Sequence, residues 1–171
     1  MKKLLLASLL CVLCSCSSKE KKDESMVSTS LAHASISGKA QGEVSFVPTV
    51  NGVVMKVAVS GLKPNGTHGY HIHEFGRCDK PDYKSAGGHF NPGKHSHGGP
   101  SASLKHMGDL GNLVANDKGV AEKEILMRDL KDVNAIKNKA IIIHEKADDY
   151  LTQPTGNSGG RIACGVIRLK E

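Results

Sequence analysis

The sequence predicts an all-β protein whose short strands form a β-sandwich or a small barrel. Three observations lead to this fold class. Apolar and polar residues alternate over short segments, as in strands that bury one face. The 19 glycines supply turns between these segments, and no segment has a long helical period. The 171 residues are most economically one domain, which is long enough to bury a core of its own.

We expect about eight strands, of which four precede the histidine-rich part of the chain. Residues 34–40 and 42–48 indicate a pair of strands around a glycine turn. Residues 52–62 alternate well, and the side chains available to the core are Val53, Val57, Val59 and either Met55 or Val54. A turn containing Pro and Asn-Gly then leads into a strand at residues 69–75.

The other expected strands follow a long loop and are residues 108–115, 119–126, 140–146 and 162–170. Residues 127–139 have a weak helical period and form either a short turn of helix or a loop. The segment between Phe75 and His106 is rich in Gly, Pro, His and Ser and has no strand pattern. A loop of this length in a compact domain is usually functional or tied down.

The first residues have the pattern of an export signal. They combine a basic start, an apolar stretch too short to span a bilayer and small residues at its end. Leu13-Cys14-Ser15-Cys16 resembles a bacterial lipobox, in which Cys16 is lipidated. The alternative is an ordinary cleaved signal peptide. We expect a signal peptide at 1–15, a solvated tether at 16–30 and the domain at 31–171.

Export also bears on the cysteines, of which there are 5. Cleavage removes Cys11 and Cys14, and lipidation occupies Cys16, which leaves Cys78 and Cys164. Two cysteines in an oxidising compartment are expected to form a disulfide; the alternative is a pair of buried free thiols. The formal net charge of +6 includes no block of like charge, so a nucleic-acid partner is not expected.

The histidines predict a metal site. Residues i and i+2 of a strand point to the same side, so His71 and His73 can reach one ion while Ile72 faces the core. Further candidate ligands follow in the loop and beyond it: His89, His95, His97, His106, Asp109 and His144. Imidazoles with one carboxylate suit zinc, and an all-imidazole set suits copper. The alternative is a scatter of surface or core histidines. The sequence contains no His-Glu-x-x-His zincin motif.

Six segments together resemble the copper–zinc superoxide dismutases of the bacterial envelope. In chain order they are GYHIHEFGRC, AGGHFNP, HGGP, HMGDLGN, HEKADD and GGRIACGVI. The resemblance implies an eight-stranded Greek-key β-sandwich or flattened barrel with long metal-binding loops. It also implies one copper ion and one zinc ion per subunit, and an enzyme that converts superoxide to oxygen and hydrogen peroxide by copper redox cycling. The alternative function is a non-enzymatic periplasmic protein that binds copper or zinc.

The resemblance implies a role for each matching residue. The copper ligands are expected to be His71, His73, His89 and His144, and the zinc ligands His89, His97, His106 and Asp109. His89 would bridge both ions and supply a proton. Asp148 would join the outer nitrogens of His71 and His97. Arg161 would guide and hold the anion beside Thr155, a channel-lining residue, with the disulfide pinning its loop.

Some features depart from the family or stay open. The loop at 149–160 is short and has no lysine, so Arg161 and Lys146 are expected to supply most of the attraction for anions. His33, His68 and His95 are expected not to be ligands, although His95 could compete with His97. The lipid would anchor the protein to the membrane facing the periplasm, and Ser17 favours the outer membrane. The subunit is expected to be either a monomer or a homodimer.

Overall fold

The structure is a computed structural model that describes residues 31–170. Within this range the chain forms strands and two short 3-10 helices. In order these elements are β1 (Ala32–Gly38), β2 (Gln41–Thr49), β3 (Gly52–Ser60), β4 (Thr67–His73), η1 (Lys84–Ala86), β5 (Asp109–Val114), β6 (Ala121–Met127), η2 (Val133–Ile136), β7 (Ala140–His144), β8 (Arg161–Val166) and β9 (Arg168–Leu169). The predicted all-β fold class is therefore confirmed.

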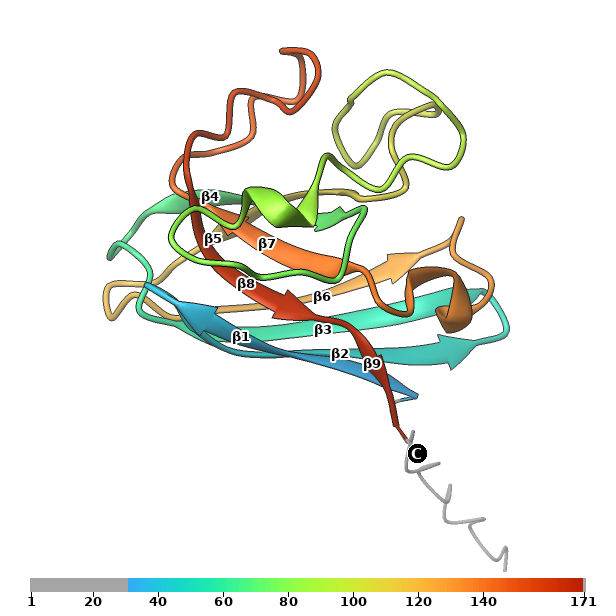
Figure 1. Ribbon diagram of the computed structural model, residues 1–171, viewed down its shortest axis with the longest axis horizontal. Coiled ribbons are helices and arrows are strands. Elements are labelled where there is room, and N and C mark those ends of the chain that lie inside the picture. Colours follow the sequence, from blue (N-terminus) through green and yellow to red (C-terminus); the bar gives the residue numbers. More distant parts are fainter. Residues whose placement is uncertain (1–30, 171) are drawn as a thin grey trace, which may run out of the picture.

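The strands form two packed layers that join into a nearly closed barrel (Figure 1). Their order is β5-β4-β7-β8-β1-β2-β3-β6, with β9 beside β1. The layers join where the end of β1 leaves β2 and pairs with β8, at Ser37 opposite Cys164 and Gly38 opposite Ala163. β3 and β4 are consecutive in the chain but far apart in this order, so the connection crosses between layers, as in Greek-key folds.

All eight predicted strands have a counterpart in the structure. The structure differs from the prediction in the last strand, and it resolves the open alternative for residues 127–139. The segment predicted as one strand at 162–170 divides into β8 and β9 at Ile167. The cause is a change of partner: the Ile167 N–H donates to the Lys139 carbonyl, and the Asn138 N–H donates to the Ile167 carbonyl. Residues 127–139 contain the short helix η2.

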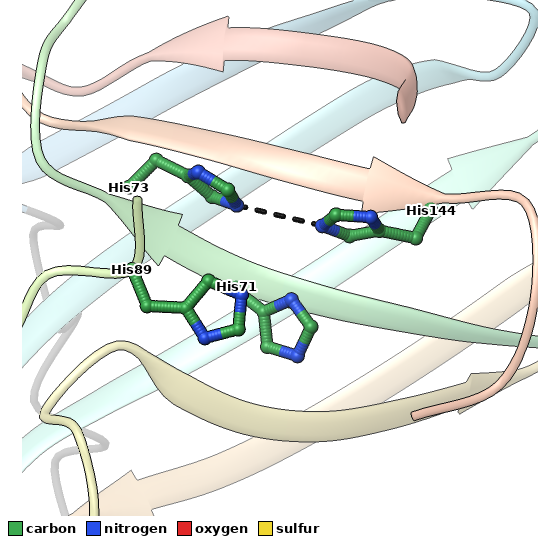
Figure 2. A group of neighbouring side chains, drawn as sticks. All are labelled: His71, His73, His89 and His144. Atoms are coloured by element: carbon green, nitrogen blue, oxygen red, sulfur yellow. Dashed lines mark hydrogen bonds between the residues drawn. The ribbon is translucent and has the colours of Figure 1, made fainter. Parts of the chain in front are cut away.

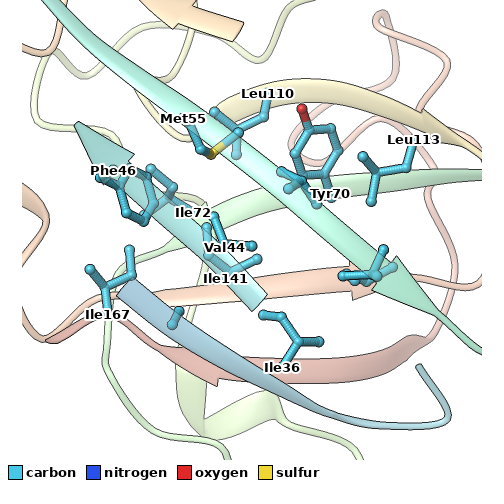
Figure 3. Packing of buried hydrophobic residues seen from close by; sticks show 14 of the residues in the cluster. Ile36, Val44, Phe46, Met55, Tyr70, Ile72, Leu110, Leu113, Ile141 and Ile167 are labelled. Atoms are coloured by element: carbon cyan, nitrogen blue, oxygen red, sulfur yellow. The ribbon is translucent and has the colours of Figure 1, made fainter. Parts of the chain in front are cut away.

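One core lies between the layers and is filled by aliphatic and aromatic side chains (Figure 3). Phe46, Met55, Tyr70, Ile72 and Ile141 are among its fully buried members. Met55 is buried and Val54 is only partly buried, which settles the open choice in β3. Each such side chain contributes roughly 1.5–3 kcal/mol when fully buried. The core makes the barrel a rigid support for its loops.

The long loop after β4 is tied to the barrel at several points. The predicted disulfide between Cys78 and Cys164 is present, with a Cα–Cα distance of 5.7 Å. The loop then forms η1, and His89 makes an isolated β-bridge with His73. This loop and the segment before β8 extend from the same side of the barrel (Figure 1).

The predicted signal peptide, tether and lipidated Cys16 lie outside the described residues. Between residues 31 and 170, no helix has the length and the apolar character needed to cross a bilayer.

Candidate metal centre

Strand β4 positions the first two histidines of the centre. Its residues alternate, so Ile72 enters the core while His71 and His73 lie on the other face, beneath the long loops. β7 pairs with β4 and ends at His144, whose Nε2 lies 3.4 Å from Nε2 of His73. His89 arrives on the loop, and its ring stacks on that of His71 at 3.9 Å between centroids. Figure 2 shows the four rings converging.

These four histidines, His71, His73, His89 and His144, form one group that can hold a metal ion. Each offers one ring nitrogen, and the four nitrogens lie within 4.8 Å of one another. The opposite ring nitrogens are held from outside: His73 Nδ1 donates to the Gly87 carbonyl at 2.9 Å, and His144 Nδ1 to the Gly159 carbonyl at 3.3 Å. Backbone carbonyls accept only from N–H groups, so both Nε2 atoms are left with lone pairs that point inward.

Two inward nitrogens of this group, His71 Nδ1 and His89 Nε2, are buried without a hydrogen-bond partner. An unpaired buried polar atom is costly, and coordination of a cation satisfies it. Four neutral imidazoles are a donor set that suits copper. The residues therefore fit a copper ion.

A second group, which adjoins the first, consists of His89, His97, His106 and Asp109, and their ligand atoms also lie within 4.8 Å of one another. Nδ1 of each histidine approaches Asp109 Oδ1, at 2.8 Å for His89, 3.0 Å for His97 and 3.1 Å for His106. The other Asp109 oxygen accepts the backbone N–H groups of Gly98 and His106. Three imidazoles and one carboxylate are a donor set that suits zinc.

His89 belongs to both groups. Its Nδ1 lies 2.8 Å from Asp109 Oδ1 in the second group, and its Nε2 has no protein partner and faces the first. One imidazole thus presents a nitrogen to each group. This geometry permits a ring that bridges two ions.

Asp148 connects the two groups from behind. Its Oδ2 accepts from His71 Nε2 at 2.8 Å, and its Oδ1 accepts from His97 Nε2 at 2.9 Å. Such a partner fixes the tautomer and the orientation of a ligand ring. Asn112 on β5 holds the Asp148 backbone, because its amide accepts from the Asp148 N–H at 2.7 Å and donates to the Asp148 carbonyl at 2.9 Å.

Burial keeps the ligands in the protonation state that coordination needs. Desolvation lowers the pKa of His71 and of His73 well below its usual value, with repulsion from His89 as the next cause. Desolvation also lowers the pKa of His144 to about 4. Burial alone would raise the pKa of Asp109, but hydrogen bonds from His89 and Gly98 lower it to about 2. These histidines are therefore neutral, and this carboxylate charged, near neutral pH.

Arg161 begins β8 opposite His144 and is half-buried. Its guanidinium donates to the Tyr83 carbonyl at 2.7 Å and to the Gly87 carbonyl at 2.6 Å. The Gly87 carbonyl also accepts from His73, so the cation is held next to the first group. Thr155 is half-exposed in the loop before β8, where its carbonyl accepts from the Ser158 hydroxyl at 3.1 Å. The exposed Lys146 packs its stem against Gly159.

The three other histidines of the described chain lie outside both groups. His95 is exposed, and only its backbone is held, by Asn91. His33 is half-buried in β1. His68 is buried and supports the centre indirectly, because its Nδ1 donates to the His144 carbonyl at 2.8 Å.

Sequence reasoning missed several supports of the centre, among them His68, Asn112 and the Gly87 carbonyl. Asn112 lies in the quoted segment HMGDLGN, but its partner Asp148 is distant in the sequence. The pairing of β4 with β5 on one side and with β7 on the other brings the two together. A backbone carbonyl such as that of Gly87 leaves no signal in residue type.

Comparisons with known proteins agree with this geometry. Residues 40–167 match the family described as copper/zinc superoxide dismutase (SODC). The chain is 41% identical over 138 residues to superoxide dismutase (Cu-Zn) 1 of Aquifex aeolicus, covering 77% of this chain and 82% of the relative. It is 40% identical over 147 residues to superoxide dismutase (Cu-Zn) 2 of the same organism, covering 80% and 86%. A crystal structure of a double mutant of a SOD-like protein from Bacillus subtilis superposes with a TM-score of 0.70, at 38% identity, over 78% of this chain and 95% of that chain.

Proposed function

This chain belongs to the copper/zinc superoxide dismutase family, and we propose that it removes superoxide in a bacterial cell envelope, held at the membrane by a lipid on Cys16. It is a superoxide dismutase with copper and zinc as its cofactors, and it converts superoxide into oxygen and hydrogen peroxide. The place of action, the lipid and the role of each site residue are the proposed parts.

We assign copper to His71, His73, His89 and His144, and zinc to His89, His97, His106 and Asp109. The observation that carries this assignment is the position of His89. It is the one residue common to the two groups, and it turns Nδ1 towards Asp109 and Nε2 towards the all-histidine group. A buffer or carrier protein has no need of a ring shared between two unlike sites.

Copper supplies one-electron redox chemistry when bound, and zinc supplies a fixed charge that does not change oxidation state. The protein contributes position and protons. Arg161 carries a permanent positive charge beside the all-histidine group and binds the superoxide anion there. His89 Nε2 is the buried atom at which a proton is held for the peroxide product. Thr155 lines the path by which the anion approaches Arg161. Asp148 holds the rings of His71 and His97 in the orientation that coordination needs.

Dismutation by the purified protein loaded with both metals tests the assignment. We expect superoxide to decay rapidly in stopped-flow measurements when both metals are at full occupancy. Arg161→Ala should slow this decay while the copper and zinc contents stay unchanged. Full metal occupancy without dismutation would instead support the alternative, a non-enzymatic copper- and zinc-binding protein.

The envelope location is supported by the leader pattern and by the lipobox-like tetrad that ends at Cys16. We expect cells fed labelled palmitate to incorporate it into the wild-type protein, and membrane fractionation to recover the protein with the outer membrane. Cys16→Ser should abolish both results, whereas Cys14→Ser should retain them. Labelling that survives Cys16→Ser would exclude this anchor.

The sequence leaves open whether the subunit is a monomer or a homodimer. Analytical ultracentrifugation of the purified protein distinguishes the two.

A further inference from the structure

The Arg161 guanidinium is aimed by the two ends of one short helix. Tyr83 precedes η1 and Gly87 follows it, and their carbonyls accept from Nη1 at 2.7 Å and from Nη2 at 2.6 Å. Hydrogen bonds from a charged donor are strong and directional. The direction of the guanidinium therefore depends on where η1 sits.

The Tyr83 ring fixes the position of η1. It is only 5% exposed and belongs to a small hydrophobic cluster that is separate from the main core and consists of Tyr83, Ala86, Ala140, Ile142 and Cys164. The ring thereby spans from the loop to β7 and β8. Its hydroxyl reaches β1, since a Cβ at Gly38 would lie 2.8 Å from that oxygen. The side chain is wedged where the two layers of the barrel join.

The Tyr83 backbone also departs from what a tyrosine ordinarily adopts. Its φ of 55° lies in the left-handed region, which is unfavourable for residues with a large side chain and persists only where the surroundings enforce it. The same carbonyl that receives Arg161 also accepts the Ala86 N–H at 3.1 Å. The burial of the ring and the hydrogen bond from the Tyr83 N–H to the Asp79 carbonyl at 3.0 Å both oppose a change of this conformation.

We propose that Tyr83 is a positioning residue for Arg161. Its buried ring holds η1 so that the carbonyls of Tyr83 and Gly87 point the guanidinium at the site where the anion binds. The proposal rests on the role of Arg161 as the anion-binding residue. In this proposal, Tyr83 and the disulfide both set the direction of the Arg161 guanidinium. The disulfide joins the same loop to β8 through Cys78, which lies earlier in the chain.

The test measures anion binding directly, with azide as the probe. Azide is titrated into the copper- and zinc-loaded protein, and the visible absorbance of copper gives its dissociation constant. We expect Tyr83→Ala to weaken azide binding roughly three- to tenfold, with copper content, zinc content and the disulfide unchanged. Tyr83→Phe keeps the buried ring and should restore wild-type affinity. Arg161→Ala sets the largest loss that this site can show.

The outcomes separate this proposal from the proposed function. If Arg161→Ala leaves azide binding unchanged, the role of Arg161 itself is wrong. If Arg161→Ala weakens binding and Tyr83→Ala does not, the positioning role alone is overturned. If Tyr83→Ala loses copper together with azide affinity, Tyr83→Leu is measured, since it keeps an apolar side chain in the cluster. Loss of copper in that variant as well shows a structural residue and overturns the proposal; weakened azide binding with copper retained supports it.

Discussion

Two side chains join the histidine groups at the scale of single residues, and they do so by different means. His89 places one ring nitrogen in each group. Asp148 touches neither set of inward atoms and holds the outer nitrogens of His71 and His97 with its two oxygens. The rings can therefore coordinate only in the tautomer and orientation that this carboxylate selects.

Replacing Asp148 tests this link. Asp148→Ala leaves two buried ring N–H groups without an acceptor, so His97 loses the partner that orients it. We expect zinc affinity to fall roughly 10–100-fold, as measured by competition with a chelator of known affinity. Asp117→Ala, which removes an exposed acid in the turn between β5 and β6, is the matched control. Equal zinc affinities in the two variants would contradict the linking role.

The sequence could predict much of this centre, including Asp148 and the disulfide, but not all of its supports. The two-residue spacing of His71 and His73 on a strand predicts that both side chains lie on one face. The remaining candidate ligands were predicted from the resemblance of their segments. The structure brings all of them together. Asn112 could not be found in this way, because an asparagine in a strand has many ordinary uses. Its contact with Asp148 exists only once β5 and the loop after β7 are packed together.

At the scale of elements, the disulfide joins the loop after β4 to strand β8. Cys78 and Cys164 are separated by 86 positions, and Cys164 lies on the same strand as Arg161. A cross-link over such a distance removes many conformations from the unfolded chain. The loop that carries Tyr83 and Gly87 is thus held at both ends, by the disulfide and by the bridge between His89 and His73.

The Cys78→Ser, Cys164→Ser double variant measures this contribution. On the chain-entropy account, closing a loop of this length stabilises the fold by about 4–5 kcal/mol. We expect the free energy of unfolding from urea titration to fall by about that amount. We also expect the variant to dismutate superoxide more slowly while it still holds its zinc. Adding reductant to the wild-type protein should reproduce the change. A loss of less than about 1 kcal/mol would show that the loop is held by its other contacts.

Strand positions were predictable because alternation and glycine turns are local. The division of β8 from β9 was not, since the 162–170 segment keeps its strand pattern through Ile167. The break arises from hydrogen bonds to Asn138 and Lys139, which lie far away in the sequence. Only a weak helical period indicated the helix η2. Its N-terminal cap is Asp132, whose side chain accepts a hydrogen bond from the Asn134 N–H, and this residue is a signal that could have located the helix.

For the whole molecule, the fold buries a cluster of titratable groups that are normally exposed. The members of the two groups that can hold metal ions all lie at 7% exposure or less, and the barrel core beneath them is apolar. Burial penalises the charged form of each imidazole. Without metal ions, the stability of the fold must therefore depend on pH.

We expect the free energy of unfolding of the metal-free protein to fall as the pH is lowered from 6.5 to about 4. Folding lowers the pKa of His144 from 6.5 to about 4, so between these values the unfolded chain binds a proton that the folded protein does not. Stability therefore rises with pH across this window, by about 3 kcal/mol from His144 alone. Asp109, with its pKa lowered from 3.8 to about 2, acts in the same direction below that window.

Urea titrations of demetallated protein over a series of pH values measure this dependence. His144→Gln should flatten the slope, because the variant removes one of the groups whose pKa differs between the two states. A stability that is constant, or that increases on acidification, would contradict the argument.

The Gly87 carbonyl has a consequence for how the centre can be altered. One oxygen accepts from His73 Nδ1 at 2.9 Å and from Arg161 Nη2 at 2.6 Å, so both of its lone pairs are in use. A rotation of that single peptide plane would displace the His73 ring of the all-histidine group and the Arg161 guanidinium in the same movement. With the roles proposed for His73 and Arg161, a variant that moves this peptide is expected to alter copper coordination and anion binding together.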